Sequence, residues 1–262
     1  MKTYKKALSV LIWILAVLVL WESVSYILRE VLQDPLASKK VPGLLEIAGS
    51  FLDNSPELLR QAGITVTYAA EGFVIGASVG IILAIVMSLS GLCEKIILPY
   101  LLISQMIPVL GLAPIIFGLF KDIAVSRVVI AAYITFFPVS VNLLSGLKSA
   151  EQQMRTMFRA YASGKRQFYT KLLIPHSLPY LFTGLKISAP MAVTAAILVD
   201  TLSARDGIGY VIVFTLYGGG TAGQFWPAIL LAALLGLCSY FIISAAEYIF
   251  IPWKRHAQEV NT

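Results

Sequence analysis

Six apolar segments, each about as long as a bilayer is thick, constrain this sequence more than any other feature. They cover approximately residues 7–28, 64–89, 96–120, 126–147, 180–202 and 226–251. A membrane-spanning helix needs about 20 mainly apolar residues, because the hydrocarbon core is about 30 Å thick. A segment in lipid must satisfy its own backbone polar groups, which favours α-helix throughout. The sequence therefore predicts an all-α, polytopic integral membrane protein with about six transmembrane helices, forming a single domain over residues 1–262.

The distribution of basic residues indicates the orientation of these helices. Only 13% of the 262 residues are charged, against about 25% in ordinary soluble domains, and the formal net charge is +6. Lysines and arginines flank the apolar segments, twelve on the side of the N-terminus and seven on the opposite side. Since basic residues accumulate on the cytoplasmic side, both termini are expected there. The same explanation of the positive charge removes the reason to expect a nucleic-acid partner.

The residues between the first two apolar segments, 34–63, mix leucine, isoleucine and phenylalanine with polar side chains. This moderate amphipathic pattern predicts a short helix on the outer membrane surface, and an ordinary loop is the alternative. The first segment is too long for the apolar region of a signal peptide, and no small-residue cleavage site follows it. It is therefore expected to be retained as a span.

The sequence contains no pattern typical of an active site, a metal centre or a cofactor site. Cys93 and Cys238 form no CxxC pair, and Asp200 and Asp206 flank Arg205 without metal-ligand spacing. The ATP-binding pattern GxxxxGK[ST] is absent as well. We therefore expect no catalytic residue, metal or cofactor, and any ATP that the protein uses must be bound by another chain.

A basic stretch that contains prolines, "ASGKRQFYTKLLIPHSLPY" at residues 162–180, interrupts the apolar sequence. Before it, four apolar residues share one face of a helix: Met154, Met157, Phe158 and Tyr161. Gly164 then permits a turn, and a second helical stripe over residues 168–173 is expected to end at Pro175 and Pro179, before the fifth span begins. Two interpretations stay open, a basic loop at the lipid headgroups and a docking element for a soluble partner.

This stretch resembles the EAA loop of ABC importer permeases, whose pattern is Glu-Ala-Ala, three residues, Gly, nine residues, Ile, any residue, Leu-Pro. Anchoring the pattern on Pro175 places the motif glycine at Ala162 and the Glu-Ala-Ala at residues 156–158. The run "QFYTKLLIPHSLPYLFTGLKIS" is similar to the sulfonate, taurine and nitrate branch of these permeases. Further similarity lies in "GFVIGASVGIILAIVMSLS", "LPYLLISQMIPVLGLAPIIFGLF" and "GIGYVI".

The resemblance implies the permease subunit of an ATP-driven, type I ABC importer in a bacterial inner membrane. The implied partners are two cytoplasmic ATPase subunits, a second and identical permease chain, an extracytoplasmic solute-binding protein and the lipid bilayer. The solute would be a sulfonate-, taurine- or nitrate-like anion, or a compound like a thiamine precursor or riboflavin. The ATPase would contact a coupling loop at about residues 148–178, through Met157, Phe158, Arg159, Tyr161, Ala162, Gly164 and Pro175.

Prolines and acidic residues inside the apolar segments are the candidates for the translocation path. Breaks are expected at Pro108 and Pro114 in the third span, Pro138 in the fourth and Pro190 in the fifth. Simple helix packing is the alternative explanation of these prolines. Ionisable residues are costly in lipid, which singles out Glu71, Asp200 and Glu247. Asp200 is the strongest of the three, because the resembled family often has an acidic residue near this point.

Two other classes of membrane protein would leave different patterns in the sequence. A stand-alone secondary transporter or channel would predict an inverted repeat or a cluster of charges at mid-membrane, and neither is present in the sequence. A membrane-embedded enzyme would need a pattern such as HExxH or clustered aspartates, which is also missing.

Overall fold

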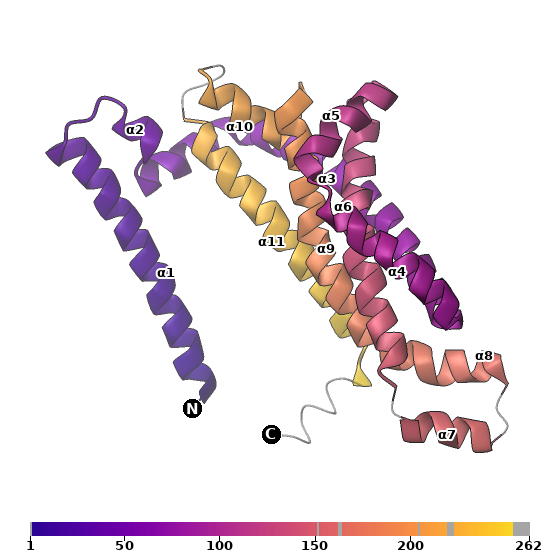
Figure 1. Cartoon of the computed structure of the whole chain (residues 1–262). Helices are drawn as coiled ribbons and strands as arrows, with labels where there is room; N and C mark the ends of the chain where they lie inside the picture. Colours follow the sequence, from indigo (N-terminus) through magenta and orange to yellow (C-terminus); the bar gives the residue numbers. More distant parts are fainter. Residues whose placement is uncertain (1, 151, 162–163, 204, 219–222, 254–262) are drawn as a thin grey trace. The chain divides into compact units, whose positions relative to one another are not determined.

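The computed structural model describes residues 2–150, 152–161, 164–203, 205–218 and 223–253, and all regular structure in these ranges is helical (Figure 1). The first half of the chain contains α1 (Lys2–Tyr26), the π-helix η1 (Ile27–Val31), α2 (Ala37–Lys40), α3 (Leu44–Leu89), α4 (Gly91–Met106) and α5 (Val109–Phe120). The second half contains α6 (Ile123–Lys148), α7 (Gln152–Ala160), α8 (Lys165–Phe168), the π-helix η2 (Tyr169–Leu173), α9 (Ile174–Ser203), α10 (Ile208–Leu216) and α11 (Phe225–Phe250). The all-α prediction is confirmed.

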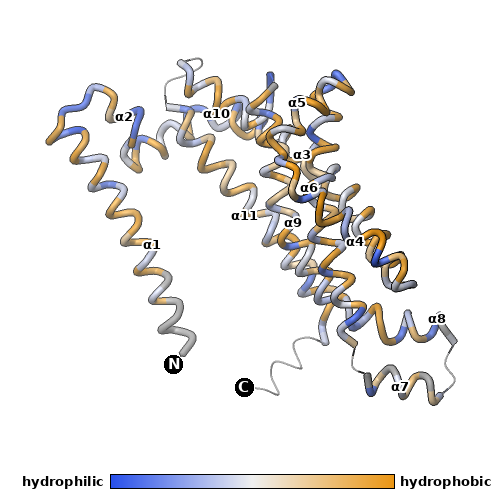
Figure 2. The backbone as a smooth tube through the Cα atoms, viewed as in Figure 1, coloured by the Kyte–Doolittle hydropathy of each residue, from blue (hydrophilic) through white to orange (hydrophobic). Residues whose placement is uncertain are grey.

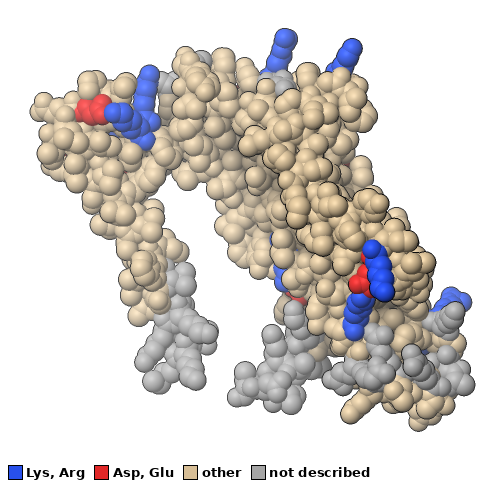
Figure 3. All heavy atoms as spheres, in the orientation of Figure 1, with Lys and Arg blue, Asp and Glu red and all other residues tan. Residues whose placement is uncertain are grey.

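Long apolar helices dominate the described chain, as the hydropathy colouring in Figure 2 shows. Five helical stretches there are long and apolar enough to cross a membrane, and the count rises to six if the bent pair α4 and α5 forms one span. Figure 3 shows wide areas of the surface without any lysine, arginine, aspartate or glutamate. These features agree with the prediction of about six transmembrane helices.

The chain divides into two compact units. Unit 1 comprises Met1–Arg60 and Val211–Leu231, and unit 2 comprises Gln61–Tyr210 and Ala232–Thr262. Helices α3, α10 and α11 each contribute residues to both units. Unit 2 contains all the coupling and path candidates that the sequence singled out.

In unit 1, two tryptophans tie the ends of three helices together. The rings of Trp21 and Trp226 meet edge to face with centroids 4.8 Å apart. The Trp21 indole N–H donates to the Pro42 carbonyl at 2.9 Å, and that of Trp226 donates to the Lys39 carbonyl at 3.1 Å. Tryptophan side chains with an apolar body and one satisfied polar group are typical of membrane–water interfaces. This arrangement fixes the end of α1 and the start of α11 against the segment that leads into α3.

The expectation of a separate short helix in residues 34–63 is wrong. Only α2 is separate, and α3 continues from Leu44 through Pro56 to Leu89 as one helix of 46 residues. Pro56 has no N–H to donate to the Leu52 carbonyl one turn earlier. The Ser55 hydroxyl donates to that carbonyl at 2.9 Å instead. The lost backbone bond is thus replaced, which allows the helix to pass through the proline.

Of the four prolines expected to break spans, only Pro108 does so. Helices α4 and α5 meet there at an angle of 96°, with Ile107 and Pro108 both extended, at ψ 121° and 120°. This is the conformation that a proline imposes on the residue before it. Pro114, Pro138 and Pro190 lie inside α5, α6 and α9, so the predicted breaks at these three positions are wrong. A proline removes a single backbone hydrogen bond, and a helix packed against neighbours can tolerate that loss.

A ridge of three glycines brings α3 against α6 in unit 2. A Cβ atom added to Gly72 would lie 2.5 Å from the Ala131 Cβ, and one added to Gly80 would lie 2.6 Å from the Phe136 carbonyl oxygen. At Gly76 it would lie 2.8 Å from the Thr135 Cβ. These separations leave no room for a side chain. In membranes such close backbone approach is a main source of helix association, because lipid is as apolar as the side chains.

Helix α9 packs on α6 in the same manner. A Cβ atom at Gly184 would lie 2.9 Å from the Pro138 carbonyl oxygen, and one at Gly146 would lie 2.7 Å from the Tyr180 Cβ. Buried alanines continue the contact, since Ala192 and Ala195 of α9 share a core cluster with Ala131 of α6. Helix α6 is therefore the central helix of unit 2, with α3 and α9 both packed against it.

The glycine ridge predicts a position-dependent effect of adding one methyl group to α3. Gly76→Ala should destabilise the protein by about 1–3 kcal/mol through overpacking against α6. Gly63→Ala is the matched control in the same helix, because a Cβ there meets no atom within 4 Å. It should stabilise the helix by up to about 1 kcal/mol through higher helix propensity. Thermal unfolding of the detergent-solubilised variants, followed by circular dichroism, measures both; equal midpoints would contradict this packing.

Candidate functional site

The largest buried charged side chain in the described chain belongs to Arg127, near the start of α6. Arg127 is 2% exposed, and Asp200 near the end of α9 is 1% exposed. Arg127 Nε lies 2.6 Å from Asp200 Oδ1. Its Nη2 donates to both the carboxylate and the backbone carbonyl of Asp206, at 2.6 and 2.8 Å. The guanidinium also lies 5.1 Å from the centroid of the Tyr68 ring, within range of a cation–π interaction.

The second oxygen of Asp200 connects this ion pair to α3 and to the start of α10. The Thr65 hydroxyl donates to Asp200 Oδ2 at 2.6 Å and accepts from the Ile208 amide at 2.9 Å. The Gln61 side-chain oxygen accepts from the Gly207 amide at 2.6 Å. The first amides of a helix have no partner within it, so side chains from α3 cap α10 here. Gly207 has φ +93°, a left-handed conformation that a residue with a side chain rarely adopts.

We call the residues Gln61, Thr65, Arg127, Asp200 and Asp206 the Arg127 network. A buried ion pair persists in an apolar environment only when its remaining hydrogen-bonding capacity is satisfied. Here both carboxylate oxygens of Asp200 have donors, so the network cross-links α3, α6, α9 and the loop before α10. Asp200 is the residue that the sequence favoured, whereas the charge pattern placed Arg127 among the residues that flank the spans, and it is instead buried in α6. No sequence pattern connects residues so far apart.

A second ion pair lies between α9 and α11. Lys186 Nζ lies 2.6 Å from Glu247 Oε2, with side chains 18% and 11% exposed. Lys186 is twelve residues after Ile174, the first residue of α9, which corresponds to about 18 Å along the helix. Both residues lie within apolar segments, where an unpaired charge would be costly. Glu247, a weak path candidate from the sequence, therefore has a basic partner that the sequence did not indicate.

The basic stretch and the helix before it form a helical hairpin, which we define as α7, α8 and η2. Figure 1 shows α7 and α8 side by side and transverse to α6 and α9. The predicted end of the second stripe at Pro175 and Pro179 is wrong, because helical structure continues from Lys165 to Ser203. In η2 the Ile174 amide donates to the Tyr169 carbonyl, one residue further back than in an α-helix. Such a π turn changes the hydrogen-bond register where Pro175 has no N–H to contribute.

The hairpin divides the predicted apolar stripe into an inner and an outer part. Phe158 is half-buried, and its ring meets that of Phe168 edge to face at 6.2 Å. Met157 and Tyr161 are 51% and 80% exposed. Gly164 lies just before α8, and its carbonyl accepts from the Phe168 amide at 3.1 Å. Ala162, where the motif glycine was placed, lies outside the described residues, as does the side chain of Arg159.

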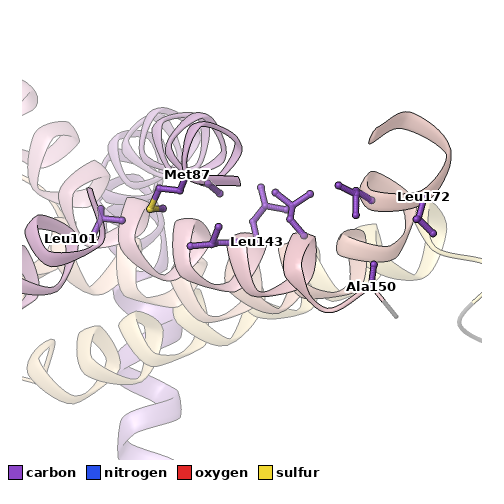
Figure 4. Close-up of a cluster of buried hydrophobic side chains, with 9 residues drawn as sticks. Met87, Leu101, Leu143, Ala150 and Leu172 are labelled. Atoms are coloured by element: carbon purple, nitrogen blue, oxygen red, sulfur yellow. The ribbon is translucent and has the colours of Figure 1, made fainter. Parts of the chain in front are cut away.

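A buried apolar cluster connects the hairpin to three long helices. It contains Ala84 and Met87 of α3, Leu101 of α4, Leu143, Leu144 and Leu147 of α6, and Ala150, Leu172 and Leu173. Figure 4 shows these side chains in a continuous row from Leu101 to Leu172. The Tyr169 hydroxyl also donates to the Ser88 carbonyl at 3.3 Å, and Lys148 pairs with Glu94. The hairpin is thus attached to the end of α3 that is farther from the Arg127 network.

The predicted path prolines differ in their exposure. Pro108 and Pro114 are exposed on the bent pair α4 and α5, whereas Pro138 is buried in α6. Pro190 in α9 is half-buried, and its carbonyl accepts from the Thr194 hydroxyl at 3.0 Å.

Comparison with known proteins identifies the family of this chain. Residues 76–253 match the family described as binding-protein-dependent transport system inner membrane component. The chain belongs to this family of ABC importer permeases. The formylaminopyrimidine transport permease protein ThiX of Halalkalibacterium halodurans is 32% identical, over 97% of this chain and 99% of the relative. The nitrate import permease protein NrtB of Synechococcus elongatus is 28% identical, over 84% and 81%.

The permease fold is also present in solved structures. The structure described as an amino acid ABC transporter with histidines superimposes with a TM-score of 0.61. It shares 15% identity, and the match covers 78% of this chain and 96% of that one. The family match and the curated relatives, which include a permease named for aliphatic sulfonates, confirm the resemblance to importer permeases of the sulfonate- and nitrate-like branch. The permease is a multi-pass protein of the inner membrane.

The Arg127 network predicts a large effect of removing the buried cation. Arg127→Met leaves Asp200 without its charged partner and should destabilise the permease by about 3–5 kcal/mol. Arg60→Met is the matched control, since it breaks an ion pair with Glu57 whose side chains are 60% and 49% exposed. An exposed pair contributes about 0–1 kcal/mol. Thermal unfolding in detergent compares the two variants, and similar midpoints would show that the network does not hold the helices together.

Proposed function

We propose that the permease forms the translocation path of an importer that also contains two ATPase subunits, a second copy of this chain and an extracytoplasmic binding protein. The absence of an ATP-binding pattern in the sequence supports a separate ATPase. The family description, which names transport that depends on a binding protein, supports the extracytoplasmic partner. The whole chain acts in this proposal as one permease domain in a bacterial inner membrane.

The hairpin is the proposed contact with the ATPase, and its exposed apolar tip is the observation that supports this most directly. Met157 near the end of α7 and Tyr161 just after it expose large side chains, as insertion into a groove on a partner requires. The buried apolar cluster attaches this tip to α3, α4 and α6. A displacement imposed on the hairpin by nucleotide-driven closure of the ATPases would therefore reach these helices together. Arg159, Ala162, Gly164 and Pro175 complete the proposed coupling surface.

The orientation follows from this assignment. If the hairpin meets a cytoplasmic ATPase, the end of unit 2 with the Arg127 network faces the opposite side of the membrane. The excess of lysine and arginine on the side of the hairpin supports the same orientation, with both termini in the cytoplasm. Pro108, Pro114, Pro138, Pro190 and Asp200 stay candidates for the moving parts of the path.

The solute is a small molecule delivered by the binding protein. The similar permeases are named for formylaminopyrimidine, a thiamine-precursor-like compound, and for nitrate. Both kinds of solute are therefore candidates for this permease.

The coupling proposal predicts that exposed apolar side chains dominate ATPase binding. Met157→Ala and Tyr161→Ala should each raise the Kd for the ATPase by about 10- to 100-fold, because burying such a side chain contributes about 1.5–3 kcal/mol. Gln153→Ala and Arg166→Ala change exposed polar residues of the same hairpin and serve as controls. Their effect should stay below about fivefold. Affinity is measured with purified permease and ATPase in detergent.

Phe158→Ala tests a different part of the hairpin. Because Phe158 packs on Phe168 inside the hairpin, this change should lower thermal stability as well as ATPase binding. If the double variant Met157→Ala with Tyr161→Ala keeps its ATPase affinity and its ATP-dependent uptake, the hairpin is only an anchor at the membrane interface and not a coupling element. If the permease alone, without any ATPase, carries solute into proteoliposomes, the proposal is wrong and the protein is a stand-alone transporter.

A further inference from the structure

One face of α3 changes from polar to apolar along its length. This face lies opposite the glycine ridge. Successive residues of a helix are rotated by about 100°, and this rotation places the residues named below within a sector of about 80° on the side away from the glycines. The half nearer the Arg127 network exposes Thr67, Glu71, Val74 and Ser78, which we call the α3 strip. The half nearer the hairpin exposes Ile82, Ile85 and Leu89.

Glu71 is the charged residue of the α3 strip, and its charge has no counterion in the described part of the chain. Glu71 is exposed, and among the described residues it makes no hydrogen bond or ion pair. The lysine, arginine, aspartate and glutamate side chains in the interior of α6, α9 and α11 are all paired, Arg127 with Asp200 and Asp206, and Lys186 with Glu247. The described spans therefore place a net negative charge on an accessible face, with no unpaired lysine or arginine in those three helices to balance it.

The depth of the α3 strip favours water over lipid as its surroundings. Glu71 precedes Leu89 by 18 residues, or about 27 Å along the helix, and Ser78 precedes it by about 17 Å. With a hydrocarbon core about 30 Å thick, the strip extends from one boundary to mid-membrane. Polar side chains at such depths are normally found facing a water-filled cavity or another helix. The hydroxyls of Thr67 and Ser78 donate to carbonyls one turn earlier, which leaves their oxygens free to accept from water.

We propose that the α3 strip lines the water-filled outer mouth of the translocation path, and that Glu71 makes this mouth selective for uncharged or cationic solutes over anions. The inference rests on the proposed function, because it assumes that the hairpin marks the cytoplasmic end. A carboxylate in a confined mouth raises the local concentration of cations and lowers that of anions. Of the two kinds of solute that the similar permeases carry by name, an uncharged one fits this mouth and nitrate does not.

Charged thiol reagents test the proposal without knowledge of the natural solute. Cys93 and Cys238 are replaced by serine, and single cysteines are introduced as Val74→Cys and Ser78→Cys. Membrane-impermeant cationic and anionic methanethiosulfonates, carrying trimethylammonium and sulfonate groups, are added to intact spheroplasts. The rate of modification is measured for each reagent and divided by its rate with free 2-mercaptoethanol. Ile85→Cys, on the apolar half of the same face, is the control for access through lipid.

Both introduced cysteines should react from outside, whereas Ile85→Cys should not. The normalised rate for the cationic reagent should exceed that for the anionic one by about 3- to 10-fold, the effect of one charge about 5–10 Å away in water. Glu71→Gln should bring this ratio close to one, and Glu71→Lys should invert it. Expression and thermal stability of the Glu71 variants are checked in parallel, since an exposed side chain should tolerate both changes.

Two results would overturn the proposal. If Val74→Cys and Ser78→Cys do not react, the face is covered by lipid or by the second permease chain. If they react but Glu71→Gln leaves the ratio unchanged, Glu71 does not determine the charge of the mouth. The labelling experiment does not need the ATPase. Its failure is therefore distinct from a failure of the hairpin variants to change ATPase affinity.

Discussion

The contact of α3 with α6 at three successive glycines is the interaction on which the rest of unit 2 depends. Lipid offers little hydrophobic force to bring helices together, so association relies on close van der Waals contact and on polar bonds between helices. Glycine at positions 72, 76 and 80 allows the backbones to meet, and Gly184 allows α9 to approach α6 as closely. This spacing places Thr65 and Arg127 within hydrogen-bonding distance of Asp200.

The polar bonds add direction to this packing. Glycine contacts set how near two helices lie, whereas the Arg127 network also fixes their register and orients the loop that starts α10. The pair of Lys186 and Glu247 does the same for α9 and α11. In both cases each charge has a partner of opposite sign. Glu71 differs, because it is an acidic residue on an exposed face of α3. The interior charges thus support the architecture, whereas the charge of Glu71 stays exposed.

The two ends of unit 2 are built from different chemistry. An apolar cluster joins the hairpin to α3, α4 and α6, while hydrogen bonds and ion pairs join the same long helices at the other end. Apolar contacts are non-directional and tolerate small shifts, whereas a buried ion pair is strongly sensitive to distance. A permease that receives a displacement at the hairpin and keeps a fixed helix register at its other end would benefit from this difference.

Hydrophobic length and turn-forming residues determined much of this protein from sequence alone. Six apolar segments of membrane-spanning length gave the fold class, and the pattern around Pro175 gave the family, because both depend on residues close together in the chain. The break at Pro108 was predictable for the same reason. The continuous helices through Pro56, Pro138 and Pro175, the burial of Arg127 and the pairing of Lys186 with Glu247 were decided by tertiary structure. Each of these depends on a partner, a replacement hydrogen bond or a counterion that local sequence rules do not supply, and most of these partners are distant in sequence.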